Sequence, residues 1–198
     1  MAEPIAVVAD ASVLINLNAT ERAADILAAL PYPVQVTAIA ADELAEDRRS
    51  GRNDRAALAV LVGLGHLRVV SLNQTALSIF ESLVIGPAAD TLDDGEAATL
   101  AQAAALGLVP AMDDRKGLRL CNSRFPMLRP MSTVDLFRAD AVVDALGRDR
   151  LGDAVFLALR NARMRVMPHH VAWVVGLIGP DRASLCASLP RQSRPPPG

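Results

Sequence analysis

The sequence predicts an α/β fold in which helices cover both faces of a central parallel sheet of about five strands. Short apolar runs such as residues 5–10 and 34–39 have the composition of strands that are buried on both faces. Segments with apolar residues at helical spacing separate these runs. Because strands joined through helices pair in parallel by right-handed crossovers, the alternation predicts three layers, α/β/α.

Each predicted element has its own signal in the sequence. The strands are predicted at residues 5–10, 34–39, 67–72 and 108–112, with a fifth short strand near 129–132. Pro110 indicates an edge or irregular position for the fourth strand, because proline cannot donate to the ladder. Helices are predicted at 12–30, across 40–65 with a polar break, and at 73–84, 93–107 and 114–125.

The character of the chain changes near Phe137. Residues 1–137 are predicted to form the α/β domain, and residues 138–186 a wholly helical C-terminal extension. The proline-rich residues 187–198 are predicted to be disordered.

Composition narrows the class of protein. Of the 198 residues, 52% are hydrophobic, and the net charge of -2 gives no global electrostatic case for a nucleic-acid partner. Cys121 and Cys186 are far apart and form no metal-binding spacing, which indicates free thiols inside the cell. No signal peptide or membrane-spanning run is recognisable, so we expect a cytoplasmic protein without membrane contacts.

Acidic residues follow the predicted strands at the points where those strands end. Asp10 closes the first strand, and Glu43 lies near the start of the helix after the second. Glu96 lies at the start of the helix leading into the fourth strand, which Asp113 and Asp114 follow directly. The carboxyl ends of parallel strands and the first turns of crossover helices share one edge of a sheet, so these acids are predicted to converge there.

Converging carboxylates repel one another and are costly to keep ionised unless a cation neutralises them. Hard divalent ions with oxygen ligands, Mg²⁺ or Mn²⁺, are the natural counter-charge. Such ions suit phosphodiester hydrolysis, because they activate water and neutralise the charge that builds on phosphate oxygens.

Four segments together resemble the motifs of PIN-domain nucleases. "VVADASVLINL" is similar to their first motif and "AADELAED" to their second. "LDDGEAATLAQAAALG", followed by "VPAMDDRKGLRL", resembles a branch with a Gly-Glu-Ala third motif and an Asp-acid-Arg fourth motif. The resemblance covers roughly residues 5–137, and it implies a PIN-like three-layer fold with a C-terminal helical extension.

The resemblance implies a Mg²⁺- or Mn²⁺-dependent nuclease of single-stranded RNA, often the toxin of a toxin–antitoxin pair. It implies a homodimer and an antitoxin protein that covers the acidic edge. By motif, the metal-binding acids would be Asp10, Glu43, Glu96 and Asp113, with Asp114 as the alternative fourth acid and with Ser12 contributing to the first motif.

Structural interpretations compete at each position. Asp10 and Ser12 could cap the helix that follows them, and Asp93 has the capping-box spacing to Glu96. Arg115 and Lys116 could bind RNA phosphates or form a solvated face. In the C-terminal extension, core packing or a partner contact explains His169, His170 and Trp173 better than catalysis does.

Two other functions compete with the nuclease interpretation. A phospho-acceptor receiver module also gathers acids at this edge, but it needs an aspartate after the third strand, where the sequence reads "VVSLNQ". A catalytically inactive PIN-like module that binds RNA or protein through its helical extension remains the alternative.

Overall fold

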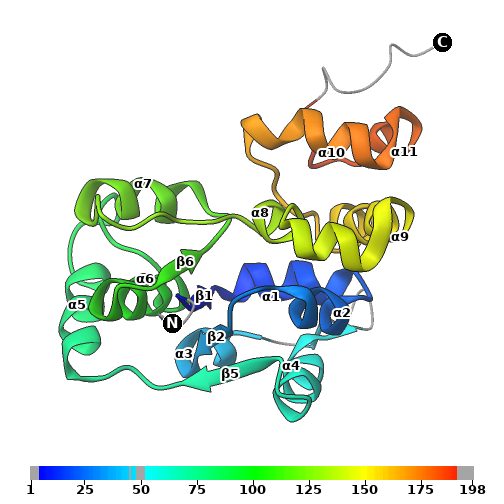
Figure 1. Cartoon of the computed structure of the whole chain (residues 1–198). Coiled ribbons are helices and arrows are strands. Elements are labelled where there is room, and N and C mark those ends of the chain that lie inside the picture. Colours follow the sequence, from blue (N-terminus) through cyan, green and yellow to red (C-terminus); the bar gives the residue numbers. More distant parts are fainter. Residues whose placement is uncertain (1–4, 45, 48–51, 191–198) are drawn as a thin grey trace. The chain divides into compact units, whose positions relative to one another are not determined.

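The computed structural model of the chain describes residues 5–44, 46–47 and 52–190 (Figure 1). Its sheet has four parallel strands in the order β5-β2-β1-β6, which confirms the predicted α/β class. The strands are β1 (Val7–Ala9), β2 (Val34–Thr37), β5 (Leu67–Val70) and β6 (Val109–Ala111). The predicted fifth strand is reduced to a single parallel bridge between Ala111 and Met131.

Pro110 fits β6 because its nitrogen faces away from β1. The N–H of Val109 donates to Ala6 O at 3.1 Å, and Asp10 N–H donates to Ala111 O at 3.0 Å. Since N–H groups alternate along a strand, Pro110 lacks only a donor on the outer side. There its carbonyl accepts from Met131 N–H at 2.9 Å. β6 therefore ends the four-stranded order, as the proline indicated.

The chain groups into two compact units that are not consecutive in sequence. The first contains residues 1–14 and 31–132, and the second contains residues 15–30 and 133–198. The boundaries predicted from the sequence, at residues 137 and 186, stay predictions, and residues 191–198 of the predicted disordered tail lie outside the described part.

In the first unit, helices follow each strand of the sheet. They are α3 (Ala38–Asp42), α4 (Asp54–Gly63), α5 (Gln74–Val84), α6 (Asp94–Leu106) and α7 (Arg115–Arg124). A short antiparallel pair, β3 (Glu46–Asp47) and β4 (Arg52–Asn53), lies within the predicted polar break, whose other residues are partly outside the described part.

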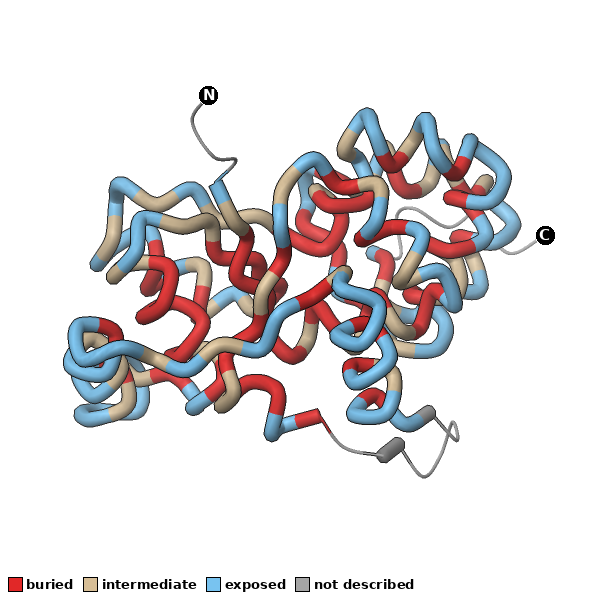
Figure 2. The backbone as a smooth tube through the Cα atoms, turned by 60° about the horizontal axis from the view of Figure 1, so that its bottom comes forward, coloured by how far each residue is buried: buried red, intermediate tan, exposed pale blue. Residues whose placement is uncertain are grey.

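Helix α6 is the centre of this unit. It packs against β1, β2, β6, α3, α5 and α7. Its buried residues include an unbroken run from Ala97 to Ala103, because small side chains allow close approach on several sides. Gly107 ends the helix in the left-handed conformation (φ 66°), as a C-terminal glycine does. Buried residues are drawn red in Figure 2.

The single helix predicted over residues 12–30 is wrong. Two helices, α1 (Ala11–Ala19) and α2 (Ala23–Ala29), replace it, and Glu21 adopts a left-handed conformation between them (φ 59°). The Thr20 hydroxyl donates to Leu17 O at 2.5 Å and accepts from Arg22 N–H at 3.0 Å. This side-chain bonding offers the backbone an alternative to helix continuation.

The second unit is helical, but it is not continuous helix. Besides α2 it contains α8 (Thr133–Phe137), α9 (Asp140–Asn161), the 3₁₀ turn η1 (Pro168–His170), α10 (Val171–Ile178) and α11 (Pro180–Ser184). Helix α9 is kinked at Gly147, whose backbone is non-helical (φ 73°). α9 packs against α2, α8 and α10. Both cysteines are buried free thiols, and no described helix has the length and apolarity to cross a membrane.

Candidate functional site

At the carboxyl edge of the first unit's sheet, Asp10 lies near enough to Glu43 and Glu96 for its charge to act on both. Asp10 directly follows β1, and Asp113 and Asp114 lie between β6 and α7. Glu43 ends α3, and Glu96 is the third residue of α6. These acids interact electrostatically. The charge of Asp10 raises the pKa of both Glu43 and Glu96, and the charge of Asp114 also raises that of Glu96.

Asp10 is a buried acid at the end of β1. Its side chain is 4% exposed. Oδ2 accepts from the Ser12 hydroxyl at 2.8 Å and from the Ser12 N–H at 3.4 Å. Oδ1 is buried and has no hydrogen-bond partner among the described residues. Burial is the main cause that raises the Asp10 pKa, and the Ser12 hydroxyl and the backbone N–H groups of Ala11 and Ser12 oppose it.

Glu43 reaches from α3 to the start of α6. Its Oε1 accepts a hydrogen bond of 2.7 Å from the Gly95 N–H. Burial raises the pKa of Glu43, the bond from Gly95 lowers it, and the charges of Asp93, Asp10 and Asp94 raise it further. This carboxylate therefore lies against the first turn of α6, among other acids.

Glu96 does not behave as a capping-box residue. Asp93 caps α6, as expected, with Oδ1 accepting from Glu96 N–H at 3.2 Å. Within the described part the Glu96 side chain makes no return bond to Asp93, and its Oε2 instead stands 3.7 Å from the point where a Cβ on Gly117 would be. Burial and the charges of Asp93, Asp114 and Asp10 raise the Glu96 pKa to about 8.

The two adjacent aspartates differ in what they do. Asp114 caps α7, with Oδ2 accepting from Lys116 N–H at 2.6 Å and from Gly117 N–H at 3.1 Å. One oxygen of Asp114 is therefore bonded to the first turn of α7. Asp113 is only 4% exposed.

The sequence did not reveal that the charge of Asp93 acts on the other acids of this edge. Its charge raises the pKa of Asp10, Glu43 and Glu96, although the sequence assigned it to capping alone. The available signal was its position, because an acid that caps a crossover helix stands at the same edge as the strand ends.

Helix α7 carries three basic residues close to the acidic edge, and their side chains have different surroundings. Lys116 lowers the pKa of Glu96, so its ammonium acts on the acidic group. Arg115 is exposed at the first position of α7. Arg119 instead donates to Ala89 O at 2.6 Å and so braces the loop before α6.

The donor set suits a hard divalent ion. In the described part of the chain, no three carboxyl, imidazole or thiol groups lie close enough together to enclose an ion. Mg²⁺, however, commonly keeps several waters and binds through one or two carboxylates. The buried Oδ1 of Asp10 lacks a hydrogen-bond partner. Neighbouring negative charges raise the pKa of Glu43 and of Glu96. These oxygens fit such an ion.

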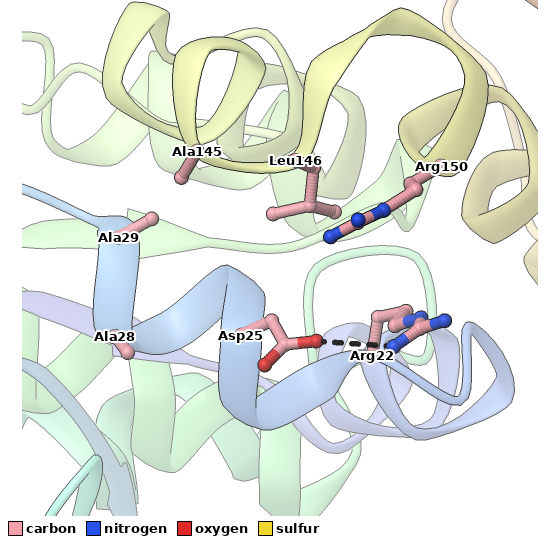
Figure 3. A pocket seen from close by; sticks show the side chains of 7 residues that line it. All are labelled: Arg22, Asp25, Ala28, Ala29, Ala145, Leu146 and Arg150. Atoms are coloured by element: carbon pink, nitrogen blue, oxygen red, sulfur yellow. Dashed lines mark hydrogen bonds and ion pairs between the residues drawn. The ribbon is translucent and has the colours of Figure 1, made fainter.

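A cavity of about 350 Å³ in the second unit offers a different chemistry. Figure 3 shows Arg22 and Asp25 of α2 on one side, facing Leu146 and Arg150 of α9. Arg22 is paired with Asp25 at 3.5 Å, and Arg150 adds a second positive charge, so the lining holds two arginines and a single carboxylate. It has none of the excess negative charge found at the sheet edge.

Proteins with an open parallel sheet bind their ligands beyond the carboxyl ends of the strands, and these acids lie at that edge. A family model described as the PIN domain matches residues 6–124. The chain belongs to the PIN-domain family, and a nuclease-type function goes with that membership. No curated protein matches the chain at a meaningful level of similarity.

Proposed function

We propose that the protein is a Mg²⁺- or Mn²⁺-dependent endoribonuclease that hydrolyses phosphodiester bonds of single-stranded RNA. The observation that carries this proposal is the uncompensated acidity of the sheet edge. A buried carboxylate oxygen of Asp10 lacks a hydrogen bond, and neighbouring acids raise the pKa of Glu43 and Glu96. Perturbed carboxyl groups that face one another are typical of functional sites.

In this proposal Asp10, Glu43, Glu96 and Asp113 hold the metal ion, one or two of them directly and the others through its bound waters. The bound ion would supply an activated water and stabilise negative charge on the phosphate. Asp113 is the fourth acid by its fit to the Asp-acid-Arg motif, with Asp114, which also accepts two N–H bonds from α7, as the alternative. Ser12 orients Asp10, since its hydroxyl holds Oδ2 and leaves Oδ1 available to a ligand.

The reaction adds the oxygen of water to phosphorus and breaks the bond from phosphorus to the leaving ribose oxygen, which receives a proton. Arg115 and Lys116 lie at the start of α7, where they would bind substrate phosphates. Lys116 already acts on Glu96, so its charge is within reach of the acidic edge.

The test is cleavage of a labelled single-stranded RNA by the wild type and by Asp10→Asn, with Mg²⁺, with Mn²⁺ and with EDTA. Glu81→Gln serves as the matched control, because Glu81 is an exposed acid on α5. We expect metal-dependent cleavage by the wild type and the control only. Equal cleavage by Asp10→Asn would contradict the proposal, and RNA binding without any cleavage would favour the inactive PIN-like module.

We also propose that the protein is a cytoplasmic toxin with a protein antitoxin, and that it forms a homodimer. The resemblance of the acidic motifs to a PIN branch supports these roles. Growth arrest on expression of the chain, relieved by a small protein encoded beside it, would support the toxin role. Unimpaired growth with active enzyme present would contradict it.

A further inference from the structure

The contact between Glu43 and Gly95 joins two elements that are 52 residues apart in the chain. Gly95 is the second residue of α6. First-turn N–H groups have no acceptor within their own helix and need one from elsewhere. Asp93 supplies an acceptor to Glu96 N–H, and Glu43 supplies one to Gly95 N–H at 2.7 Å. Helix α6 therefore has one local cap and one that comes from α3.

Gly95 is a glycine for reasons of space. Its φ lies outside the left-handed region, so its backbone would accept another residue. A Cβ built on Gly95 would stand 2.6 Å from Glu43 Cδ and 2.8 Å from Glu43 Oε1. Non-bonded atoms do not come as close as these distances. A side chain at position 95 would therefore displace the Glu43 carboxylate from its present position.

We propose that Gly95 is a positioning residue for the metal-binding Glu43. Its N–H fixes the carboxylate, and its lack of a side chain leaves the room in which that carboxylate lies. The inference rests on the proposed function, and it extends that function to a residue with no ionisable group. It also explains why the third acidic motif contains glycine directly before Glu96.

Gly95→Ala separates positioning from folding. The group that an alanine methyl would meet is the end of an exposed, flexible side chain, so Glu43 would swing away while α6 stays in place. Alanine also favours helix over glycine. We therefore expect Gly95→Ala to fold with a Tm close to that of the wild type and to lose the ordered position of Glu43.

The experiment is calorimetric titration of Mn²⁺ into the full-length wild type, Gly95→Ala and Gly63→Ala, with Tm measured on each. Gly63 ends α4 and has no atom within 4 Å of a built Cβ, so it is the matched control. We expect Gly95→Ala to bind Mn²⁺ about 10-fold or more weakly, the range for groups that orient metal ligands. Gly63→Ala should bind as the wild type does.

A double-mutant cycle with Glu43→Ala tests whether the effect acts through Glu43. In the Glu43→Ala background, Gly95→Ala should cause no further loss of Mn²⁺ affinity, because no carboxylate remains to be displaced. An additive loss would overturn the inference, and so would a large fall in Tm, which would assign Gly95 to packing. Equal affinity of Gly95→Ala and wild type would also overturn it.

The outcome for the wild type separates this inference from the proposed function. A wild type that binds no Mn²⁺ and cleaves no RNA overturns the proposed function and this inference with it. A wild type that binds and cleaves, together with an unaffected Gly95→Ala, overturns the inference alone.

Discussion

Both units of the protein bury charged groups, and they do so in opposite ways. At the acidic edge of the first unit, Asp10, Glu43 and Glu96 each have a raised pKa, with burial as the main cause. In the second unit, His170 is 1% exposed and stands between groups of opposite charge. Its Nδ1 lies 3.1 Å from Arg138 Nη1, and its Nε2 lies 2.9 Å from Asp135 Oδ1.

In the second unit, the polar atoms of His170 are matched by those of Arg138 and Asp135. Arginine can only donate, so Nδ1 of His170 accepts, and Nε2 carries the proton when the ring is neutral. Nε2 faces Asp135 Oδ1 at 2.9 Å, and Asp135 acts on the ring through its charge and through a hydrogen bond. Burial lowers the His170 pKa, and Asp135 opposes that shift.

The difference teaches how to distinguish a structural polar cluster from a functional one. A buried group whose neighbours supply the opposite charge needs nothing further from solution. A set of like charges that leaves a buried oxygen without a partner is complete only when a cation joins it. This criterion supports the proposal that the acidic edge binds a cation, and it assigns His170 to the structural core of the second unit.

The largest expected effect comes from Asp10→Asn. RNA cleavage should fall by about 10²–10⁴-fold, since a metal ligand contributes several kcal/mol to the transition state. The metal-free protein should keep or gain stability, because the amide still accepts from Ser12 and no longer buries a charge. Cleavage rates and thermal melts in EDTA measure the two effects. A marked loss of stability would place Asp10 with the structural cluster.

Arg138→Ala should have the opposite profile. It leaves the buried Nδ1 of His170 without its donor, at a cost of about 1–3 kcal/mol. It also removes a guanidinium 5.8 Å from the centre of the Trp173 ring. Denaturant unfolding measures the loss, and Mn²⁺ affinity should stay at the wild-type value. Unchanged stability would show that the His170 cluster is not compensated by Arg138.

The pH dependence of stability sharpens the comparison further. In the native metal-free protein the pKa of Glu96 is about 8, against 4.5 for the free group. The native state then binds more protons than the unfolded state between these values, so stability falls as pH rises through that window. Asp10 and Glu43 shift in the same direction.

Melting temperatures in EDTA should therefore decline from about pH 5 to about pH 8, the interval over which a raised carboxyl pKa costs stability. Glu96→Gln should flatten the decline, and Mn²⁺ should offset it. A flat profile in the wild type would mean that the acids of this edge do not perturb one another.

The smallest expected effect is that of Arg115→Gln. Loss of one phosphate contact should weaken RNA binding a few-fold and lower the slope of log affinity against log salt by about 1. Arg68→Gln is the control, because Arg68 is exposed on β5, at the opposite end of the sheet order from β6. Equal salt slopes for Arg115→Gln and the wild type would remove Arg115 from the RNA-binding surface.

Much of the first unit could be predicted because its signals are local. The apolar run at β1 and the capped, glycine-ended α6 follow directly from composition and end signals. The break at Glu21 could not, because residues 20–22 carry no glycine or proline and the turn depends on a side-chain bond of Thr20. Nor could the grouping of residues 15–30 with the C-terminal helices, which depends on packing of α2 against α9.

The acidic residues could be predicted as a set because parallel topology brings strand ends to one edge. The sequence could not predict which carboxylate oxygen lacks a hydrogen bond, because that depends on the positions of donors in the folded chain. Asp114, for example, accepts bonds from two N–H groups of α7. The bond from Gly95 to Glu43 crosses 52 residues and leaves no periodic signal in the sequence.

The most direct test of the central claim is the shift in Tm of the metal-free protein on addition of Mn²⁺, measured for the wild type and Asp10→Asn in parallel. Binding to the native state alone raises stability by an amount that grows with ion concentration. The account predicts a concentration-dependent rise for the wild type and a much smaller one for Asp10→Asn. Equal rises in both proteins, or none in the wild type, would contradict it.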